Sequence, residues 1–500
     1  MKPTRKSMAN AIISATVKKL LRHLPICNRR NPMLRRTRFS IGDMVNLLGI
    51  KQAYSQRLLA ARVGNFWMDS RKLQPGDVFI ALESDRNDGH AYVESALEAG
   101  AQIALVKKSK LSRYHRRMHR RLLPVTEPLK AVHKVAAAYR KKLNIPLIGI
   151  TGSNGKTTTR NFAARVLKTH MPLGETWSNW NNHIGVPLSL LRFTGAERAG
   201  IIEMGANHPG EIHQLTMTTR PDIAVLTNIG YAHVGLFGSL KKTADAKLEI
   251  TDGLRKDGRL LINGDDPRLA SPARQYRFAT HSFGFGKKCT LRAVDYRVID
   301  NSSLSFTVDD FTYRMNLVGR HFVYCALPAL YLGRHFGMSE GAIAHALLSL
   351  QPVALRGTIE QTSDVTFIVD CYNANPSSMR SALELLCDIA PESKRAAIVG
   401  DMLELGGYAG KLHFALGKQL ANAHCKPIIA VGNYARRIAE GALNAGASAG
   451  SVIAVESADE AAKQAHQTVS AGKTVLLKGS RGLQLENVFR LFQQLDITND

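Results

Sequence analysis

Residues 146–158 read PLIGITGSNGKTT, and this stretch decides the fold of the middle of the chain. The apolar run 146–150 predicts a buried strand, and a helix is expected after the turn, to about Thr169. Glycines in such a turn let backbone N–H groups face phosphate oxygens, and the helix start adds partial positive charge. Lys156 is expected to reach the β- and γ-phosphates, and the Thr157 hydroxyl to hold Mg²⁺. The predicted ATP-binding loop comprises Gly152, Ser153, Asn154, Gly155, Lys156, Thr157 and Thr158, although Ile150 stands where the usual loop has glycine.

The strand–turn–helix rhythm continues beyond this loop. Strands are expected at residues 200–204, 223–227 and 259–262, with helical segments between them. Alternation of this kind predicts parallel βαβ units in a doubly wound sheet. We therefore expect a central phosphate-loop ATPase domain over residues 145–351.

Two further domains are expected on either side. Residues 39–144 mix short strands and helices, with strands at 78–82 and 103–106 and a helix at 91–100, which predicts a mixed α/β domain. Residues 352–500 predict a Rossmann-like domain. Its expected strands are 367–370, 396–399, 427–431, 452–455 and 474–477. The fold class is thus α/β with three domains, which suits a chain of 500 residues.

Charge is unevenly distributed along the chain. The formal net charge is +27, and the first forty residues hold eleven Lys/Arg and no acid. A second basic run, 107–121, also lacks acids. Such surfaces attract polyanions, but no nucleic-acid reading module is present, so no specific nucleic acid is expected as a partner. Residues 1–38 form a basic extension, expected to be poorly ordered. Peripheral membrane contact, a transit peptide and an over-long reading frame remain alternatives for it.

Cysteine usage and hydropathy indicate a cytoplasmic protein. The six cysteines are scattered and none forms a C-x-x-C pair, which is typical of reduced thiols. No stretch of about 18 apolar residues predicts a membrane span.

Two side chains follow the expected central strands. Glu203 ends the strand after the loop, and a carboxylate at that edge of a parallel sheet suits Mg²⁺. His233 follows the strand 223–227, and a lone histidine taken by itself is more often structural.

These residues resemble a known family. TGSNGKTT (151–158), EMGANHPGEI (203–212) and TNIGYAHVGLFGS (227–239) are similar to the central domain of the Mur ligases. Further segments resemble the branch of that family that adds a dipeptide, and the D-N-P-R signature of the branch that adds one amino acid is missing. These segments are NWNNHIGVP (179–187), DCYNANPSSM (370–379), GDMLELG (400–406) and LKGSR (477–481). The resemblance covers about residues 39–495.

The resemblance implies an ADP-forming ligase. ATP phosphorylates the carboxylate of UDP-N-acetylmuramoyl-tripeptide, and the amine of D-alanyl-D-alanine attacks the acyl phosphate. The product is the UDP-pentapeptide precursor of peptidoglycan, which links the chain to cell wall biogenesis, cell shape, cell division and the cell cycle. ATP and the tripeptide carboxylate are both anions and must approach one another, so Lys156 and Mg²⁺ are needed to neutralise their charge. Two Mg²⁺ ions are expected. The resemblance further implies a monomer.

The family's functional residues are carried over to matching positions. The implied catalytic residues are Lys156, His233 and Lys247, the last as a carbamylated lysine. Implied metal ligands are Thr157, Glu203, His233 and Lys247, and Arg356 and Asp370 join the loop in binding ATP. Implied contacts of the UDP substrate, mainly in domain 39–144, are Ser70, Arg71, Asp88, Gly89, His90, Asn181 and Asn182. Implied residues on the dipeptide side are Tyr372, Asn373, Asn375, Lys478 and Arg481.

The sequence also departs from the family. Residues 319–325, GRHFVYC, carry Phe322 and Cys325 where the family often has asparagines near the adenine, so the adenine contacts stay open. Arg356 precedes Gly357, the reverse of the usual order. Two alternatives remain: a related ligase that adds a single amino acid, and a non-catalytic, nucleotide-dependent polyanion-binding protein. The third residue of the tripeptide is not set by the sequence.

Overall fold

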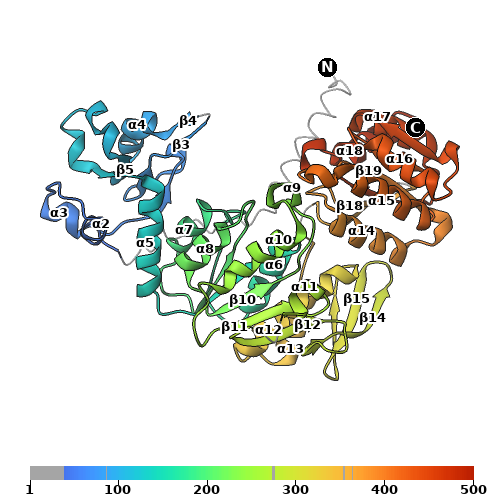
Figure 1. Ribbon diagram of the computed structural model, residues 1–500, viewed down its shortest axis with the longest axis horizontal. Coiled ribbons are helices and arrows are strands. Elements are labelled where there is room, and N and C mark those ends of the chain that lie inside the picture. Colours follow the sequence, from blue (N-terminus) through green and yellow to red (C-terminus); the bar gives the residue numbers. More distant parts are fainter. Residues whose placement is uncertain (1–38, 86, 273–275, 353–354, 363, 500) are drawn as a thin grey trace, which may run out of the picture. The chain divides into compact units, whose positions relative to one another are not determined.

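The computed structural model describes residues 39–499 except 86, 273–275, 353–354 and 363, so the expected basic extension lies outside the described residues. The described part of the chain divides into two compact units, one that ends at Pro124 and one that begins at Val125 (Figure 1). Within the described part, no helix has both the length and the apolar character needed to cross a membrane.

The first unit is a small α/β domain. Its sheet has the order β1-β2-β5-β6, and β1, β2 and β5 run parallel. Helix α2 begins at Ser40, which forms a reciprocal capping box with Asp43, and ends at Gly49 in the left-handed conformation. The elements are α2 (Ile41–Leu48), α3 (Gln56–Ala60), β1 (Phe66–Trp67), β2 (Val78–Ile80), β3 (Glu83–Ser84), β4 (Asn87–Asp88), α4 (Val93–Glu98), β5 (Ile103–Lys107) and β6 (Leu122–Val125).

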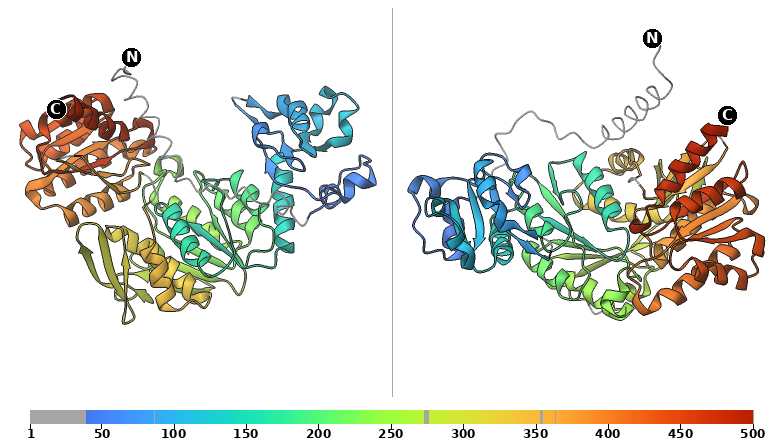
Figure 2. Two further views of the ribbon diagram at one scale, coloured as in Figure 1. Left: turned by 180° about the vertical axis from the view of Figure 1, so that it is seen from behind. Right: turned by 90° about the horizontal axis from the view of Figure 1, so that it is seen from above.

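The second unit contains a seven-stranded parallel sheet in the order β13-β12-β11-β10-β7-β9-β8. Its strands are β7 (Leu147–Thr151), β8 (Leu173–Glu175), β9 (Ala199–Glu203), β10 (Ile223–Leu226), β11 (Arg259–Asn263), β12 (Ala279–Gly284) and β13 (Leu291–Arg292). The doubly wound architecture predicted from the sequence is present, because helices cover both faces of this sheet (Figure 2).

Strand β7 shows why both faces are covered. Ile148 and Ile150 are buried in one apolar cluster with Phe162 of α6. Gly149 faces the other way, where a Cβ atom would lie 3.1 Å from Met204. A strand buried on both faces reads as a continuous apolar run, which is the pattern of residues 146–150. The helices are α5 (Pro128–Lys142), α6 (Lys156–Lys168), α7 (Gly185–Leu190), α8 (Glu211–Thr219), α9 (Val234–Phe237), α10 (Leu240–Leu248), α11 (Pro267–Ala270), α12 (Arg320–His335) and α13 (Glu340–Leu348).

Helix α5 packs in the second unit by its contacts, and the expected domain boundary near residue 144 stays a prediction. Arg140 donates from Nε to the carbonyl of Thr219 (2.7 Å) and from Nη2 to Asp222 Oδ2 (2.8 Å). His133 bonds to Thr218 through Nδ1 at 3.0 Å. The buried face of α5 is thus matched to α8, so the boundary between units lies at 124/125.

A three-stranded antiparallel sheet was not predicted. It consists of β14 (Val294–Ile299), β15 (Ser303–Val308) and β16 (Phe311–Met315). Asp309 and Asp310 link β15 and β16 with φ of 47° and 44°. Positive φ at both positions suits a tight hairpin turn, and two aspartates signal it more weakly than Asn-Gly does.

A six-stranded sheet in the order β17-β18-β22-β19-β20-β21 completes the second unit, and only its edge strand β17 is antiparallel to its neighbour. Its elements are β17 (Thr358–Gln361), β18 (Thr366–Val369), α14 (Pro376–Ile389), β19 (Arg395–Gly400), α15 (Ala409–Asn422), β20 (Ile428–Val431), α16 (Ala435–Asn444), β21 (Val452–Val455), α17 (Ala458–Thr468), β22 (Thr474–Lys478) and α18 (Glu486–Asn499). The five predicted strands correspond to β18–β22.

Helices α15 and α16 cross at two glycines. A Cβ on Gly417 would overlap the carbonyl oxygen of Ile438, and one on Gly441 would overlap that of Phe414. We expect Gly417→Ala to lower the free energy of unfolding by about 1–3 kcal/mol, because the helices must separate. Urea unfolding measures this.

Gly410→Ala is the matched control in the same helix. No described atom lies within 4 Å of its Cβ position, so this change should be neutral or slightly stabilising. Equal unfolding midpoints for the two variants would show that the crossing tolerates a methyl group.

Candidate functional site

The phosphate loop lies between β7 and α6, as predicted. Gly152 has φ of 145° and Gly155 has φ of 77°. A Cβ on Gly152 would overlap Oγ1 of Thr227, which follows β10. Both conformation and space therefore require glycine at position 152.

The segment after β10 holds the loop in shape. The carbonyl of Asn228 accepts from the Ser153 N–H (2.8 Å), and Asn228 Oδ1 accepts from the Asn154 N–H (2.9 Å). The Thr227 hydroxyl donates to the carbonyl of Asn154 (2.6 Å), and the Gly230 N–H donates to Ser153 Oγ (2.8 Å). With those amides engaged, the first amides of α6 are the ones placed for an anion, since they lack partners within a helix.

Lys156, the first residue of α6, curls over the loop. Its Nζ donates to the carbonyls of Gly152 (2.8 Å) and Ser153 (3.3 Å). Desolvation lowers the pKa of Lys156, Glu203 opposes that shift, and the nearby Arg356 adds to it. The ammonium is thus in a position to meet phosphate oxygens, which would relieve both its burial and its repulsion from Arg356.

Glu203, at the end of β9, is the buried carboxylate of the site. Its Oε1 accepts from Thr157 Oγ1 (2.9 Å) and Asn181 Nδ2 (2.8 Å). Its Oε2 is buried and has no hydrogen-bond partner among the described residues, and Arg160 Nε lies 3.4 Å away. A buried oxygen left over in this way fits a hard cation, so Glu203 and the Thr157 hydroxyl suit Mg²⁺.

His233 precedes α9 and has φ of 59°. Its Nδ1 contacts Oε2 of Glu404, which comes from the loop after β19. Burial lowers the pKa of His233, and Glu404 opposes this shift. A neutral imidazole that donates from Nδ1 keeps a lone pair on Nε2 and can therefore ligate a metal.

Lys247 of α10 is 2% exposed. Its Nζ donates to the carbonyl of Ala206 (3.1 Å) and lies 4.9 Å from the centre of the Phe237 ring. Burial lowers the pKa of Lys247 to about 7, and Lys156 adds to the shift. A substantial fraction of the amine is therefore neutral and nucleophilic near pH 7, which is the chemical condition for carbamate formation.

One cavity of about 330 Å³ is lined by most of the predicted nucleotide and metal residues, which come from the segments around the seven-stranded and the six-stranded sheets. Lys247 is absent from the described lining of this cavity. The predicted residues that line it are Ser153, Asn154, Gly155, Lys156, Thr157, Thr158, Asn181, Glu203, His233, Arg356, Asp370, Tyr372, Asn373, Asn375 and Lys478.

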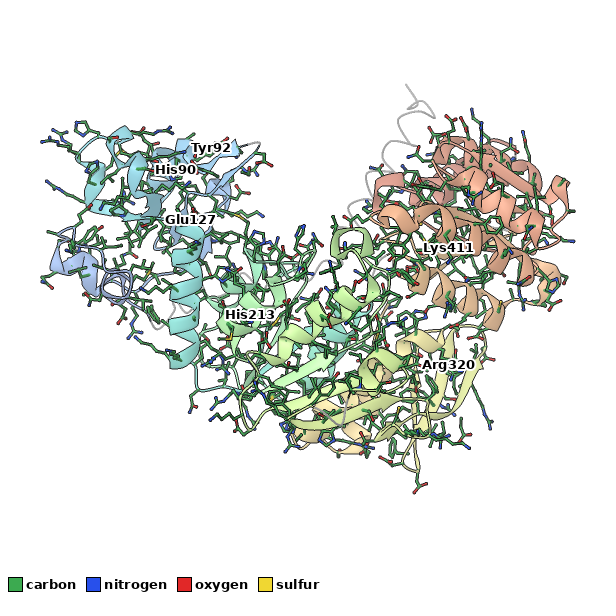
Figure 3. The ribbon with its side chains drawn as sticks, viewed as in Figure 1. His90, Tyr92, Glu127, His213, Arg320 and Lys411 are labelled. Carbon is green, nitrogen blue, oxygen red and sulfur yellow. The ribbon has the colours of Figure 1, made fainter. Side chains whose placement is uncertain are left out.

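Phe322 and Cys325, the two positions of this segment that depart from the family, line the cavity together with His321. Burial lowers the pKa of His321 to about 4, so its ring is neutral, and it packs on Phe322 with 4.2 Å between ring centres. The rings of His321 and Phe322 are tilted by 39° to each other, and the wall is largely apolar, which suits a nucleobase. Arg320, the first residue of α12 (labelled in Figure 3), points elsewhere, since its guanidinium stacks 3.9 Å from the Phe285 ring.

Lys478 and Asp370 form an ion pair at the ends of β22 and β18. Lys478 Nζ donates to Asp370 Oδ2 (2.6 Å) and to the carbonyl of Asn373 (3.0 Å), and its side chain is 1% exposed. Lys478 is therefore paired with Asp370, and its expected contact with the carboxylate of the dipeptide stays a prediction. Arg481 pairs with Glu486 and remains 54% exposed.

Asn375 has two roles in the structure. It caps α14 by accepting from the Ser378 N–H (3.0 Å), and its Nδ2 donates to Asn154 Oδ1 (2.6 Å). The Asn154 side chain returns a bond from Nδ2 to Asn375 Oδ1 (3.2 Å). This amide pair links the phosphate loop directly to the domain built on the six-stranded sheet β17–β22, which is called the third sheet from here on.

A second cavity, of about 420 Å³, adjoins the first. Both cavities share His233, Tyr372, Asn373 and Asn375, and Arg481 lines only the second. Arg356 stacks 4.0 Å from the centre of the Tyr372 ring. The predicted dipeptide residues are thereby divided between a nucleotide-side and an outer cavity.

The predicted UDP-substrate residues belong to both units. Asn181 and Asn182 lie in the second unit, where Asn182 Oδ1 accepts from the Gly185 N–H (2.9 Å). Ser70, Arg71, Asp88, Gly89 and His90 lie in the first unit, where the Arg71 side chain is 87% exposed. Their contact with a UDP group stays a prediction.

His90 (labelled in Figure 3) is buried, and both of its ring nitrogens are used internally. Its Nδ1 bonds to Asp88 Oδ1 (2.8 Å), and its Nε2 accepts from the Lys107 N–H (2.9 Å). A Cβ on Gly89 would lie 2.6 Å from the carbonyl oxygen of Leu82. His90 and Gly89 therefore shape the segment, and Asp88 offers its second oxygen to Lys110 (2.6 Å).

Four site residues were missed by sequence reasoning. Asn228 bonds to the phosphate loop, and Glu404 contacts His233. Arg160 lies 3.4 Å from Glu203, and His321 lines the apolar wall of the cavity. The segment 400–406 stands out as a motif, but no sequence feature indicates the partner of Glu404. Arg160 gave no signal, because an arginine on a helix usually faces solvent.

Gly152→Ala should weaken ADP binding by about tenfold or more, because the loop must move to relieve the overlap with Thr227. Calorimetric titration with ADP measures this. Gly210→Ala is the control: φ is also positive (86°), but no described atom lies near its Cβ position. Unchanged ADP affinity in Gly152→Ala would contradict the requirement for glycine.

Lys247→Met should remove a pH dependence of stability. The pKa of Lys247 is about 7 in the folded chain and about 10.4 in the unfolded chain, so the unfolded state binds more protons between these values. The free energy of unfolding of the wild type should therefore rise relative to the variant by up to about 1.4 kcal/mol per pH unit. Urea unfolding at pH 7.5 and 9 in CO₂-free buffer measures it. A pH-independent difference would contradict the lowered pKa.

Three family models match the chain. They are described as Mur ligase middle domain (residues 150–333), Mur ligase, glutamate ligase domain (residues 356–481) and Mur ligase family, catalytic domain (residues 63–141). The third match includes helix α5, which by its contacts belongs to the second unit.

Curated relatives and solved structures agree with these matches. A UDP-N-acetylmuramoyl-tripeptide–D-alanyl-D-alanine ligase of Bacillus subtilis (strain 168) is 33% identical over 465 residues, covering 92% of this chain and 98% of that protein. The Escherichia coli (strain K12) protein of the same name is 30% identical over 441 residues, covering 85% and 93%. MurF from Acinetobacter baumannii has a TM-score of 0.81 at 27% identity, covering 92% of this chain and all of that one. MurF from Thermotoga maritima in complex with ADP has a TM-score of 0.77 at 26% identity, covering 87% and 98%.

These comparisons confirm the predicted α/β fold, the ligase class and the use of ATP. The phosphate loop, Glu203 and His233 stand together in one cavity, and full-length relatives align over nearly the whole chain. The chain therefore belongs to the Mur ligase family.

Proposed function

We propose that this chain joins D-alanyl-D-alanine to UDP-N-acetylmuramoyl-tripeptide and converts ATP to ADP and phosphate. The observation that carries the proposal is the cavity in which Lys156, Thr157 and Glu203 face residues of the third sheet. Relatives with this named activity align over 98% and 93% of their own lengths, which supports the substrates.

The reaction has two steps. A carboxylate oxygen of the tripeptide attacks the γ-phosphorus of ATP, the bond to the bridging oxygen breaks, and ADP leaves. The amine of the dipeptide then attacks the acyl carbon, the carbon–oxygen bond breaks, phosphate leaves, and the amine loses a proton. Lys156 and the first amides of α6 offset the negative charge on the phosphates in the first step.

We propose that Thr157, Glu203, His233 and a carbamate formed on Lys247 hold two Mg²⁺ ions. Bound Mg²⁺ supplies charge neutralisation of the phosphates and polarises the phosphoryl group. The buried Oε2 of Glu203 and the lowered pKa of Lys247 support this set. Carbamylation joins the neutral Lys247 amine to CO₂ with loss of a proton and makes the side chain an anion.

The acceptor is proposed to enter the outer cavity, near Tyr372, Asn373, Asn375 and Arg481. Arg481 is the exposed cation there and would face the dipeptide carboxylate. The UDP portion is proposed to contact the first unit through Ser70, Arg71 and Asp88. We further propose that the chain acts as a monomer and that it lies in the cytoplasm. The five free cysteines of the described part support the second proposal. Membrane contact through residues 1–38 remains a proposal.

Phosphate release from ATP with UDP-N-acetylmuramoyl-tripeptide, with and without D-alanyl-D-alanine, tests the function, and mass spectrometry identifies the product. We expect release that requires both substrates and yields the UDP-pentapeptide. Lys156→Met should lower this rate by about 10²–10³-fold, because one charge-neutralising donor is lost. Lys168→Met is the control on the same helix, since Lys168 pairs with Glu175 at the surface.

Other outcomes would redirect the assignment. Release with single amino acids but not with the dipeptide would indicate a related ligase of different acceptor specificity. No turnover with any acceptor, from protein shown to be folded, would favour the nucleotide-dependent polyanion-binding alternative.

A further inference from the structure

The loop after β19 contacts the first turn of α9 through backbone atoms. The Gly235 N–H donates to the carbonyl of Glu404 at 2.9 Å. A Cβ on Gly235 would lie 2.6 Å from the nitrogen of Gly406, and one on Gly406 would lie 2.9 Å from the Gly235 Cα. The side chain of His233 also contacts that of Glu404. We use the name latch for these four residues: His233 and Gly235 on one side, and Glu404 and Gly406 on the other.

Side chains extend the same contact. Val234 is fully buried in the apolar cluster formed by α14, α15 and the six-stranded sheet. Tyr231 packs edge-on against Tyr408, with 6.1 Å between ring centres. The segment 231–235, which includes the first turn of α9, therefore docks on the third sheet's domain with an apolar anchor as well as the backbone contact.

Both polar residues of the latch have unusual backbone conformations. His233 has φ of 59° and Glu404 has φ of 61°, which side-chain-bearing residues rarely adopt. Such conformations persist only when the surroundings fix them, and they concentrate at functional sites. Here the two strained residues are the ones whose side chains meet, through His233 Nδ1 and Glu404 Oε2.

The same segment reaches the nucleotide site at its other end. Asn228 holds the amides of Ser153 and Asn154, and Gly230 bonds to Ser153. Residues 228–235 therefore run without interruption from the phosphate loop to the latch. The Asn154–Asn375 amide pair makes a second link between the loop and the third sheet's domain.

We propose that Glu404 is a positioning residue that orients His233 for a divalent cation, and that this cation site is complete only when the latch is closed. A carboxylate that accepts from Nδ1 fixes the tautomer, so that Nε2 keeps the lone pair that a cation needs. His233 lines the cavity that holds Thr157 and Glu203. Docking of the third sheet's domain is thereby coupled to cation binding beside the phosphates. This inference rests on the proposed metal site.

Mn²⁺ binding to the full chain with ADP, followed by electron paramagnetic resonance of free Mn²⁺, tests the orienting role. Glu404→Ala should weaken Mn²⁺ binding by about 10–100-fold, the usual effect of losing a partner behind a metal ligand. Glu404→Gln keeps an oxygen that can accept from Nδ1, so it should stay within a few-fold of the wild type. ADP affinity measured in EDTA should be unchanged in both. Wild-type Mn²⁺ affinity in Glu404→Ala would overturn the proposal and make the contact one of packing only.

Gly235→Ala tests the need for closure, because it leaves His233 and Glu404 chemically intact and forces the loops apart. It should weaken Mn²⁺ binding to a similar degree as Glu404→Ala. Gly407→Ala is the matched control, since its Cβ position is clear of other described atoms and it should bind as the wild type does. Normal Mn²⁺ affinity in a folded Gly235→Ala would overturn the coupling to docking. No acceptor is present in this experiment, so a failure of the proposed acceptor specificity would not change its result.

Discussion

The site depends on the close register of three neighbouring strands. Thr151 of β7 pairs with Leu226 of β10, and Ile150 pairs with Glu203 of β9. This register brings the ends of the strands together and sets Gly152 directly against Thr227. The phosphate loop can then be held by the segment that follows β10, and the buried Glu203 lies within reach of the Thr157 hydroxyl. A shift of one residue would turn each of these side chains to the opposite face of the sheet.

A second parallel edge faces the first across the nucleotide cavity. Asp370 and Lys478 follow adjacent strands, β18 and β22, and their ion pair is nearly enclosed. Such a pair adds little net stability, because desolvation offsets its attraction, but the loss of either partner leaves a costly unpaired charge. Its clearer consequence is geometric: Lys478 also binds the carbonyl of Asn373 and so fixes the turn that presents Tyr372 and Asn375.

Much of this arrangement could be predicted from sequence because it depends on local pattern. Continuous apolar strands and the glycine-rich turn specify the sheet and the loop, and Glu203 is placed by its position at a strand end. The antiparallel strands β14–β16 were missed because Asp309-Asp310 is a weak hairpin signal. Contacts between distant segments carry no local signature. The Asn154–Asn375 pair, the Glu404–His233 contact and the pairing of Lys478 with Asp370 therefore appeared only in the structure.

Charge balance connects these contacts to catalysis. Lys156 lowers the pKa of Lys247, and Arg356 lowers the pKa of Lys156. Glu203 is buried near Lys156 and opposes the lowering of its pKa. Asp370 also lines the cavity, but its charge is balanced by Lys478. Polyphosphate would relieve this excess of positive charge. Conversion of Lys247 to a carbamate would relieve it further, because the same side chain would change from a repelled cation to an anion. Burial lowers the pKa of Lys247 to about 7, so much of its amine is neutral near pH 7, and the neutral amine is the form that can react with CO₂.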